Sequence, residues 1–308
     1  MRFPYYPGCT LKTTAKNFEI SAIASARALG IELVELPRWN CCGAVYSLVS
    51  DNLMSYLAPI RNLIRVQEMN EKGILENEYR LVTLCDMCYN TLKRANLLVK
   101  EDPEKLEKIN TFMDREEDYK GNVEVLHFLE VLRDVGFKKV EEKVKNPLKG
   151  LKIAPYYGCM ILRPRGIGID DPEDPKILNE LLEALGAEVV DNPYKVRCCG
   201  SYQTVNRKYV VAELAHDILS HTVREGAEAI ALSCPLCSFN LDDRQKEVKE
   251  LHPNFREIPV FYFTQLMAIA FGLEEKSYGL NLNYVDPRPL LKNKKLLKTP
   301  LHTGGDMF

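Results

Sequence analysis

The sequence predicts an α/β protein made of two small domains in tandem, each with a parallel sheet flanked by helices. Three features support this prediction. Apolar segments of strand length alternate with segments of helical period along the chain. The same motifs occur twice in the same order, about 150 residues apart. All 10 cysteines belong to these motifs, five in each half.

The composition is that of a globular chain with enough apolar residues for two cores. The protein has 308 residues, of which 46% are hydrophobic, and a formal net charge of -2. This charge gives no electrostatic reason to expect binding to nucleic acid. The N-terminus lacks a secretory signal and no apolar run is long enough to span a bilayer, so we expect a cytoplasmic protein. In that reducing compartment, ten cysteines favour metal binding or redox chemistry over disulfides.

In the first half, the first helix is expected at residues 17–29. Apolar residues recur there with the helical period, and Gly30 offers a left-handed cap. Four short apolar runs predict strands, at residues 3–6, 33–36, 81–84 and 123–128.

The second half repeats these elements. A helix is expected at residues 177–185, directly before Gly186. Strands are predicted at residues 153–157, 188–190, 229–232 and 260–263. Strands that alternate with helices favour a parallel sheet with right-handed crossovers in each half.

The repeat also sets the domain boundaries. The stretch NPLKGLK at residues 146–152 has the turn chemistry of a linker, so we expect domains at 1–148 and 149–275. Residues 276–308, with the basic run LLKNKKLLK, lie outside the repeat. They are interpreted as a C-terminal extension that is solvated or docks a partner.

The cysteines of each half form one pattern: a single Cys after the first strand, then Cys-Cys-Gly, then Cys-x-x-Cys. Each group follows the carboxyl end of a predicted strand, where open parallel sheets place their ligands. Five thiols per half are therefore expected to converge. They are Cys9, Cys41, Cys42, Cys85 and Cys88 in the first half, and Cys159, Cys198, Cys199, Cys234 and Cys237 in the second.

Several roles could explain cysteines in this pattern. Adjacent cysteines make poor disulfides, because neighbouring Cα atoms are about 3.8 Å apart. Burial as small apolar side chains explains one or two cysteines but not ten in a repeated order. Zinc takes four ligands and has no use for a fifth. Redox-active dithiols would explain only the Cys-x-x-Cys pairs. An iron-sulfur cluster uses several converging thiolates, although neither half has the spacing of a bacterial ferredoxin.

The two complete five-cysteine motifs resemble the paired CCG domains in the B subunit of the heterodisulfide reductase of methanogens. The resemblance covers residues 1 to 270. It implies two CCG domains related by pseudo-two-fold symmetry, each with a noncubane [4Fe-4S] cluster bound by all five cysteines of its motif. It also implies the reaction of methanogenesis in which the mixed disulfide of coenzyme M and coenzyme B is reduced to two thiols.

The same resemblance implies partners. These are a flavin-containing A subunit and a ferredoxin-like C subunit, with a hydrogenase or formate dehydrogenase as the electron source. The chain has no dinucleotide-binding fingerprint of its own, so its electrons must come from a partner. Similar paired domains serve thiol:fumarate reductase, glycolate oxidase and lactate-utilisation systems. An electron-transfer subunit of that kind, or a zinc-stabilised scaffold without redox chemistry, therefore remains an alternative.

Other candidate site residues lie beside the cysteine loops. The substrate that the resemblance implies is an anionic disulfide held between the clusters. Arg163 and Arg165 follow Cys159, and Lys195 and Arg197 precede Cys198, so these cations are candidate substrate contacts, with solvated surface as the alternative. His127, at the end of a predicted strand, is a candidate proton donor, with a structural role as the alternative.

Overall fold

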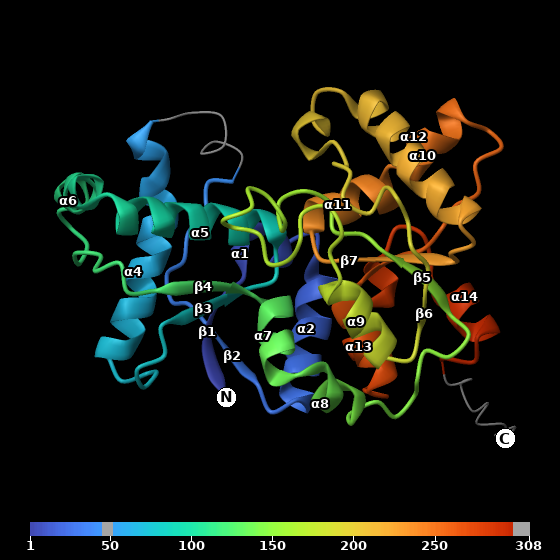
Figure 1. Ribbon diagram of the computed structural model, residues 1–308, viewed down its shortest axis with the longest axis horizontal. Helices are drawn as coiled ribbons and strands as arrows, with labels where there is room; N and C mark the ends of the chain where they lie inside the picture. Colours follow the sequence, from blue (N-terminus) through green and yellow to red (C-terminus); the bar gives the residue numbers. More distant parts are fainter. Residues whose placement is uncertain (45–51, 298–308) are drawn as a thin grey trace, which may run out of the picture.

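A computed structural model describes residues 1–44 and 52–297 of the chain. It contains two four-stranded parallel sheets, one in each half of the sequence, with helices on their faces (Figure 1). The predicted α/β class and its duplication are thus confirmed. Both ends of every observed strand lie within two residues of the predicted ends.

In the first half, the strand order across the sheet is β2-β1-β3-β4. The strands are β1 (Arg2–Tyr6), β2 (Glu32–Glu35), β3 (Arg80–Thr83) and β4 (Glu124–His127). The helices are α1 (Gly8–Leu11), α2 (Lys16–Ala28), η1 (Leu53–Tyr56), α4 (Leu57–Glu71), α5 (Asp86–Glu101), α6 (Pro103–Phe112), α7 (Phe128–Val135) and α8 (Phe137–Glu141).

The second half has the equivalent order, β6-β5-β7-β8. Its strands are β5 (Lys152–Pro155), β6 (Glu188–Val189), β7 (Ala229–Leu232) and β8 (Val260–Tyr262). Its helices are α9 (Ile177–Ala184), η2 (Ser201–Gln203), α10 (Lys208–Arg224), α11 (Pro235–Ser238), the π-helical η3 (Phe239–Asp243), α12 (Gln245–Leu251) and α13 (Phe263–Ala270), followed by η4 (Glu275–Ser277), η5 (Leu280–Leu282) and α14 (Arg288–Asn293).

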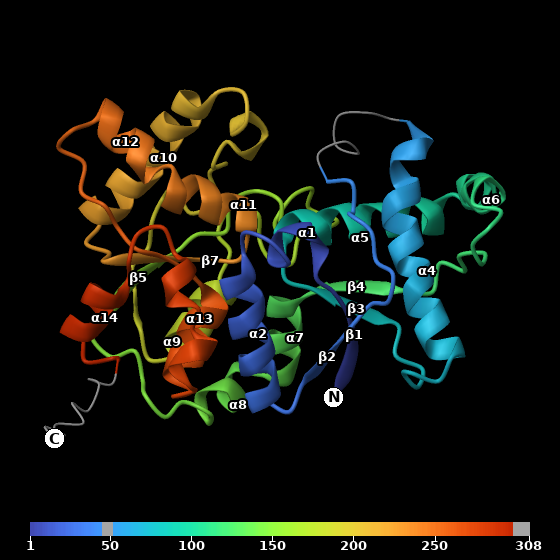
Figure 2. The same cartoon turned by 180° about the vertical axis from the view of Figure 1, so that it is seen from behind.

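The two halves pack against each other through equivalent helices. Helix α2 of the first half contacts α13 of the second, and α9 of the second contacts α7 of the first. These four helices occupy the centre of the molecule in both views (Figures 1 and 2). The Phe18 ring stacks on Tyr262 at 4.2 Å, and the Ser21 and Thr264 hydroxyls are hydrogen-bonded at 2.6 Å. An interface in which each half contributes the same two elements has two-fold character.

The segment after residue 275 packs back onto the rest of the chain up to residue 297. Backbone N–H groups of Tyr284 and Val285 donate to the Asp242 carboxylate, each at 2.9 Å, and Leu291 is fully buried. At Gly279, whose φ is 62°, a Cβ atom would lie 2.7 Å from the Cβ of Asn17 on α2. Glycine is therefore required where this segment crosses the first half. Residues 298–308 of the predicted extension lie outside the described residues.

Among residues 1–44 and 52–297, no helix combines the length and the apolar character needed to cross a membrane.

Candidate functional site

Three neighbouring strands in each half deliver the cysteines to one edge of the sheet. In the first half, the cysteine loops follow β1, β2 and β3, which are adjacent in the sheet. The loops after β5, β6 and β7 do the same in the second half. Parallel strands place their carboxyl ends together, so three loops meet on each sheet edge. The predicted convergence of the cysteines follows from this topology.

The thiols of the first half form a connected group. The sulfur atoms of Cys42 and Cys88 are 3.6 Å apart. Cys41 lies within hydrogen-bond reach of both Cys9 and Cys42, and Cys85 within reach of Cys88. Cys42, Cys85 and Cys88 are buried, whereas Cys9 and Cys41 are exposed.

The second group repeats three of these contacts. Cys199 and Cys237 have sulfur atoms 3.4 Å apart, Cys159 interacts with Cys198, and Cys234 interacts with Cys237. The side-chain amide of Asn240 also donates to the Cys199 sulfur at 3.4 Å. These three pairs correspond to Cys42 with Cys88, Cys9 with Cys41, and Cys85 with Cys88 in the first half.

The two groups touch at equivalent cysteines. Cys85 and Cys234, the first members of the two Cys-x-x-Cys motifs, are near enough to interact, since Cys234 is the largest cause of the lowered pKa of Cys85. The loop after Cys159 is also tied to α5, because the Asn90 amide donates to the backbone oxygens of Met160 at 2.7 Å and Arg163 at 2.6 Å. The ten thiols therefore form two adjoining sites at the junction of the halves.

Tyrosine and glycine residues fix the loops in both halves. The hydroxyl of Tyr6 donates to the backbone oxygen of Asn40, and that of Tyr156 to the oxygen of Arg197. Each acceptor directly precedes a Cys-Cys-Gly motif, so a tyrosine from the first loop holds the second. A glycine in each half lies against the last cysteine of that half. A Cβ atom at Gly8 would be 3.0 Å from the sulfur of Cys88, and a Cβ atom at Gly158 would be 3.2 Å from the sulfur of Cys237.

The crowded thiols share protons. Hydrogen bonds from Cys42 and Cys9 lower the pKa of Cys41 to about 2, and hydrogen bonds from Cys234 and Cys88 lower that of Cys85 to about 5. The pKa of Cys88 is raised well above its ordinary value, first by its hydrogen bond to Cys42. Some thiols can therefore ionise only while their neighbours stay protonated.

This donor set fits a polynuclear metal group. The five thiols of a half lie close together and most of them are buried. All five could therefore be ionised at once only if several positive charges, such as those of metal ions, compensated their negative charge. Five converging sulfurs exceed the four ligands of a zinc site but suit a group with several iron atoms. Gly8 and Gly158 have no side chain, so the sulfurs that they face, those of Cys88 and Cys237 respectively, are unobstructed on the glycine side. The residues present therefore fit an iron-sulfur cluster in each half.

A buried acid-histidine pair adjoins the junction. Asp86 is 1% exposed, and burial, followed by the charge of Cys234, raises its pKa to about 6. Its Oδ1 lies 3.4 Å from Nε2 of His127. His127 is fully buried at the start of α7: its Nδ1 accepts from Leu129 N–H, and its Nε2 is 2.7 Å from the Leu84 oxygen. His127 thus caps a helix and also approaches an acid beside the thiols.

Two of the four candidate substrate contacts line a common cavity. Arg163 and Arg165 are joined there by Arg94 from α5, and the cavity has a volume of about 530 Å³. Met160, which directly follows Cys159, forms part of its wall. Arg163 is also paired with Glu173 at 2.7 Å. The cavity therefore lies between the halves, is lined by three arginines and one acid, Glu173, and adjoins the second thiol group. We call it the basic cavity.

The other two candidates lie elsewhere. Lys195 is 5% exposed, and its ammonium group is paired with Asp174 at 2.7 Å and Asp191 at 2.9 Å. Arg197 is paired with Asp217 at 3.1 Å and lies over the ring of Tyr194. The structure thus brings Arg163 and Arg165 together but does not bring Lys195 or Arg197 to the same cavity.

The internal repeat gives the basic cavity a counterpart on the other side of the junction, and that space is filled. Asn90 of the cavity corresponds to Phe239, because each lies two residues after a Cys-x-x-Cys motif. Pro164 of the cavity corresponds to Thr14, because each lies five residues after the first cysteine of its half. Phe239 and Thr14 line a space of only about 10 Å³, together with Leu282 and Tyr284 of the C-terminal segment. The segment outside the repeat thus breaks the symmetry and leaves one basic cavity open.

Sequence reasoning missed two residues here. Asp86 lies inside the first Cys-x-x-Cys motif, where a carboxylate was a visible signal. Arg94 gave no signal in the sequence, since only packing of the two halves brings α5 to the loop after Cys159. Tyr6 and Tyr156, three residues before the first cysteine of each half, were visible beside the cysteine loops, but their hydrogen bonds to the next loop were not predicted.

Fold and site together define a duplicated α/β protein with a thiol-rich centre at the carboxyl ends of the strands in each half. The family model of the cysteine-rich CCG domain matches residues 3–93 and again residues 153–242. The chain therefore belongs to the CCG family and carries its domain twice, as the sequence predicted.

Named relatives are similar over nearly their whole length. The membrane anchor subunit of 8-methylmenaquinol:fumarate reductase from Wolinella succinogenes is 31% identical over 94% of this chain and 98% of its own. The B subunit of ferredoxin:CoB-CoM heterodisulfide reductase from Methanosarcina mazei is 30% identical over 90% and 92%. A protein from Archaeoglobus profundus, named for its likeness to the B subunit of heterodisulfide reductase, is 31% identical over 96% and 100%.

A solved structure shares the fold. The crystal structure of a hypothetical protein from Helicobacter pylori matches 91% of this chain with a TM-score of 0.71, at 12% sequence identity. The present chain spans 51% of that protein, about half its length. This similarity supports the two-sheet architecture alone.

Proposed function

We propose that this protein is the catalytic iron-sulfur subunit of a reductase complex and reduces an anionic disulfide to two thiols at the junction of its halves. The substrate proposed is the mixed disulfide of coenzyme M and coenzyme B, as in the heterodisulfide reductases to which the chain is similar. The observation that supports the proposal is the proximity of Cys85 and Cys234, which places the two thiol groups side by side at the junction of the halves.

The ten cysteines are proposed to hold two noncubane [4Fe-4S] clusters, one in each half. Such clusters supply electrons one at a time, whereas a disulfide needs two electrons and two protons. Two sites in contact can each serve one sulfur of the same disulfide. A single site, or two sites far apart, would have to keep a half-reduced substrate bound between electron transfers.

The basic cavity is proposed to bind the acidic groups of the substrate. Arg94, Arg163 and Arg165 supply cations that match carboxylate, sulfonate or phosphate groups. The prolines and Met160 of the same wall contact the apolar parts of the substrate. Because the equivalent space across the junction is filled by Leu282 and Tyr284, the substrate enters from the side of the arginines.

Protons are proposed to come from Asp86, with His127 behind it. A carboxyl group with a pKa of about 6 is partly protonated near neutral pH and gives up its proton readily. Asp86 lies beside Cys234, at the junction where thiolates would form. His127, 3.4 Å away, is placed to return a proton to Asp86.

The proposed complex contains a flavin-bearing A subunit and a ferredoxin-like C subunit in the cytoplasm, with a hydrogenase or formate dehydrogenase as the electron source. A reductase complex of several subunits is supported by the names of the relatives, each of which is one subunit. Within the described residues the chain offers no second cofactor fold that could collect electrons, which makes a partner necessary.

A second candidate is an electron-transfer subunit of a quinol-linked reductase. The observation in its favour is the 31% identity to the Wolinella succinogenes subunit over 98% of that protein. In that role the junction would pass electrons onward and bind no disulfide, so the arginines of the cavity would have no anionic substrate to recognise.

Turnover assays separate these candidates. The protein is prepared anaerobically with its clusters, and oxidation of a reduced viologen dye is followed with either the mixed disulfide or a menaquinone analogue as acceptor. The proposal predicts disulfide-dependent dye oxidation that is lost in Cys85→Ser. Dye oxidation with the quinone alone would favour the second candidate.

A further inference from the structure

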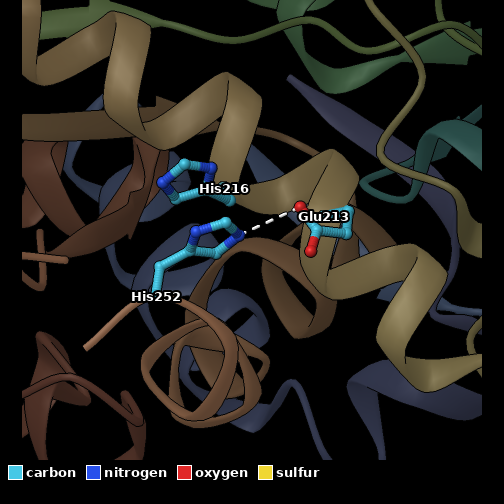
Figure 3. A group of neighbouring side chains, drawn as sticks. All are labelled: Glu213, His216 and His252. Atoms are coloured by element: carbon cyan, nitrogen blue, oxygen red, sulfur yellow. Dashed lines mark hydrogen bonds and ion pairs between the residues drawn. The ribbon is translucent and has the colours of Figure 1, made fainter. Parts of the chain in front are cut away.

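Three side chains that no part of the proposed reaction uses lie together in the second half (Figure 3), where helices α10 and α12 are neighbours (Figure 1). Glu213 and His216 are on α10, and His252 directly follows α12. One ligand atom from each, a carboxylate oxygen and two ring nitrogens, lies within 4.8 Å of the other two.

The local fold explains why these residues meet. A spacing of three on α10 places Glu213 and His216 on the same face of the helix. Helix α12 packs against α10, and its last turn presents His252 to that face. The two imidazole rings stack with centroids 3.7 Å apart, and His252 Nε2 is 3.0 Å from a Glu213 carboxylate oxygen (Figure 3).

His216 lacks the hydrogen bonds that a purely structural histidine usually has. Within the described part of the chain, neither of its ring nitrogens has a hydrogen-bond partner, and its contacts are the rings of His252 and Phe255. Among the described residues, both ring nitrogens are therefore available as ligand atoms.

We propose that Glu213, His216 and His252 bind a divalent transition-metal ion, with zinc as the best match. Two imidazoles and one carboxylate form a donor set that zinc uses when a fourth position stays open. Imidazole ligands favour zinc and its neighbours in the first row over magnesium or calcium. All three side chains reach solvent to some extent, so an ion has access to them.

The surroundings leave room for the fourth ligand. His216 and His252 line a cavity of about 480 Å³, together with Phe255 and Arg256. A water molecule or a small anion can complete the coordination from that side. Arg256 suits an anionic fourth ligand, such as hydroxide or a carboxylate, better than a neutral one.

Metal binding requires a small rearrangement. In stacked rings the lone pairs of the nitrogens run parallel, so the rings must tilt apart for both to point at one ion. The hydrogen bond between Glu213 and His252 is replaced by two metal bonds. The ion would then clamp α10 to the segment after α12, independently of the cysteine sites.

The test is zinc binding to the cluster-loaded protein, prepared anaerobically so that the cysteines are occupied. Protein is dialysed against buffered micromolar zinc, and zinc and iron per chain are measured by mass spectrometry. The wild-type protein is expected to retain one zinc ion that a His216→Gln/His252→Gln double variant does not. Single variants, including Glu213→Gln, should lose at least tenfold in affinity, with iron content unchanged.

His221→Gln is the matched control. His221 is on the same helix, but its ring hydrogen-bonds to the backbone oxygen of Asp217 and packs at a tilt against the ring of Tyr194. This variant should bind zinc like the wild type. The thermal midpoint without zinc should be similar in all variants and should rise with zinc only in the wild type and His221→Gln. Equal zinc in the wild type and the double variant, or none in either, overturns the proposal.

Discussion

Gly8 offers the sharpest test of how the first thiol group is built. Its φ is +71°, and a Cβ atom there would meet the Cys88 sulfur at 3.0 Å and the Tyr6 ring at 3.4 Å. Gly43, in the Cys-Cys-Gly motif, has a similar φ of +74°, but among the described residues the nearest atom to a Cβ there would be that of Ala58, at an ordinary 3.8 Å. The two glycines therefore share the conformational strain and differ in the contact with sulfur.

The expected cost follows from these two terms. An alanine in the left-handed region costs about 1–2 kcal/mol, which applies to both Gly8→Ala and Gly43→Ala. Forcing a carbon against a sulfur that cannot move costs about 1–3 kcal/mol more, in Gly8→Ala alone. At about 2–4 °C per kcal/mol, Gly8→Ala should lower the thermal midpoint by roughly 4–20 °C and Gly43→Ala by roughly 2–8 °C.

The assay is thermal unfolding of cluster-loaded protein under anaerobic conditions, together with iron analysis. With one cluster in each half, as proposed, Gly8→Ala should lose about half of the iron, because the cluster of the first half is displaced. Gly30→Ala is the control for strain alone, since Gly30 has a φ of +76° and a Cβ atom there would meet no atom of residues 1–44 and 52–297 within 4 Å. Equal midpoints and equal iron in Gly8→Ala and Gly43→Ala would refute the reasoning.

Three further predictions concern charges. The double variant Arg163→Gln/Arg165→Gln should raise KM for the anionic disulfide tenfold or more, with little change in kcat. Arg288→Gln, at an exposed arginine, is the control and should change neither KM nor kcat. An unchanged KM in the double variant would show that Arg163 and Arg165 do not bind the substrate. His127→Gln should lower kcat about 100-fold with iron content preserved, and normal turnover would leave His127 as a helix cap only. Burial raises the pKa of Asp242 to about 7, so the folded state keeps a proton that the unfolded chain has released. Wild-type stability relative to Asp242→Asn should therefore fall by about 2 kcal/mol from pH 5.5 to pH 7, and a constant difference between their urea midpoints would contradict this pKa.

The strands could be predicted closely because buried parallel strands are short, nearly continuous apolar runs. The run at 229–232 coincides with β7, and the one at 81–84 is shifted by one residue from β3. The grouping of the thiols was also predictable, since it needs only the position of each cysteine after a strand. Both inferences depend on local sequence and one topological rule.

The junction could not be predicted in the same way. The contact of Cys85 with Cys234 and the entry of Arg94 into the basic cavity arise from packing of one half on the other. The C-terminal segment posed a related difficulty. Its basic run suggested an extension that is solvated or docks a partner, and the structure adds that Leu291 within this run is buried. Paired leucines among lysines were the overlooked sign of a helix with one apolar face.

Anaerobic electron paramagnetic resonance, combined with iron and sulfide analysis, tests the central claim most directly. Protein with and without the mixed disulfide of coenzyme M and coenzyme B is compared at equal cluster content. Two clusters at one junction predict about eight iron atoms per chain and a signal that changes when the disulfide is added. A zinc-containing protein without iron, or clusters whose signal the disulfide leaves unchanged, would contradict the proposed reaction centre.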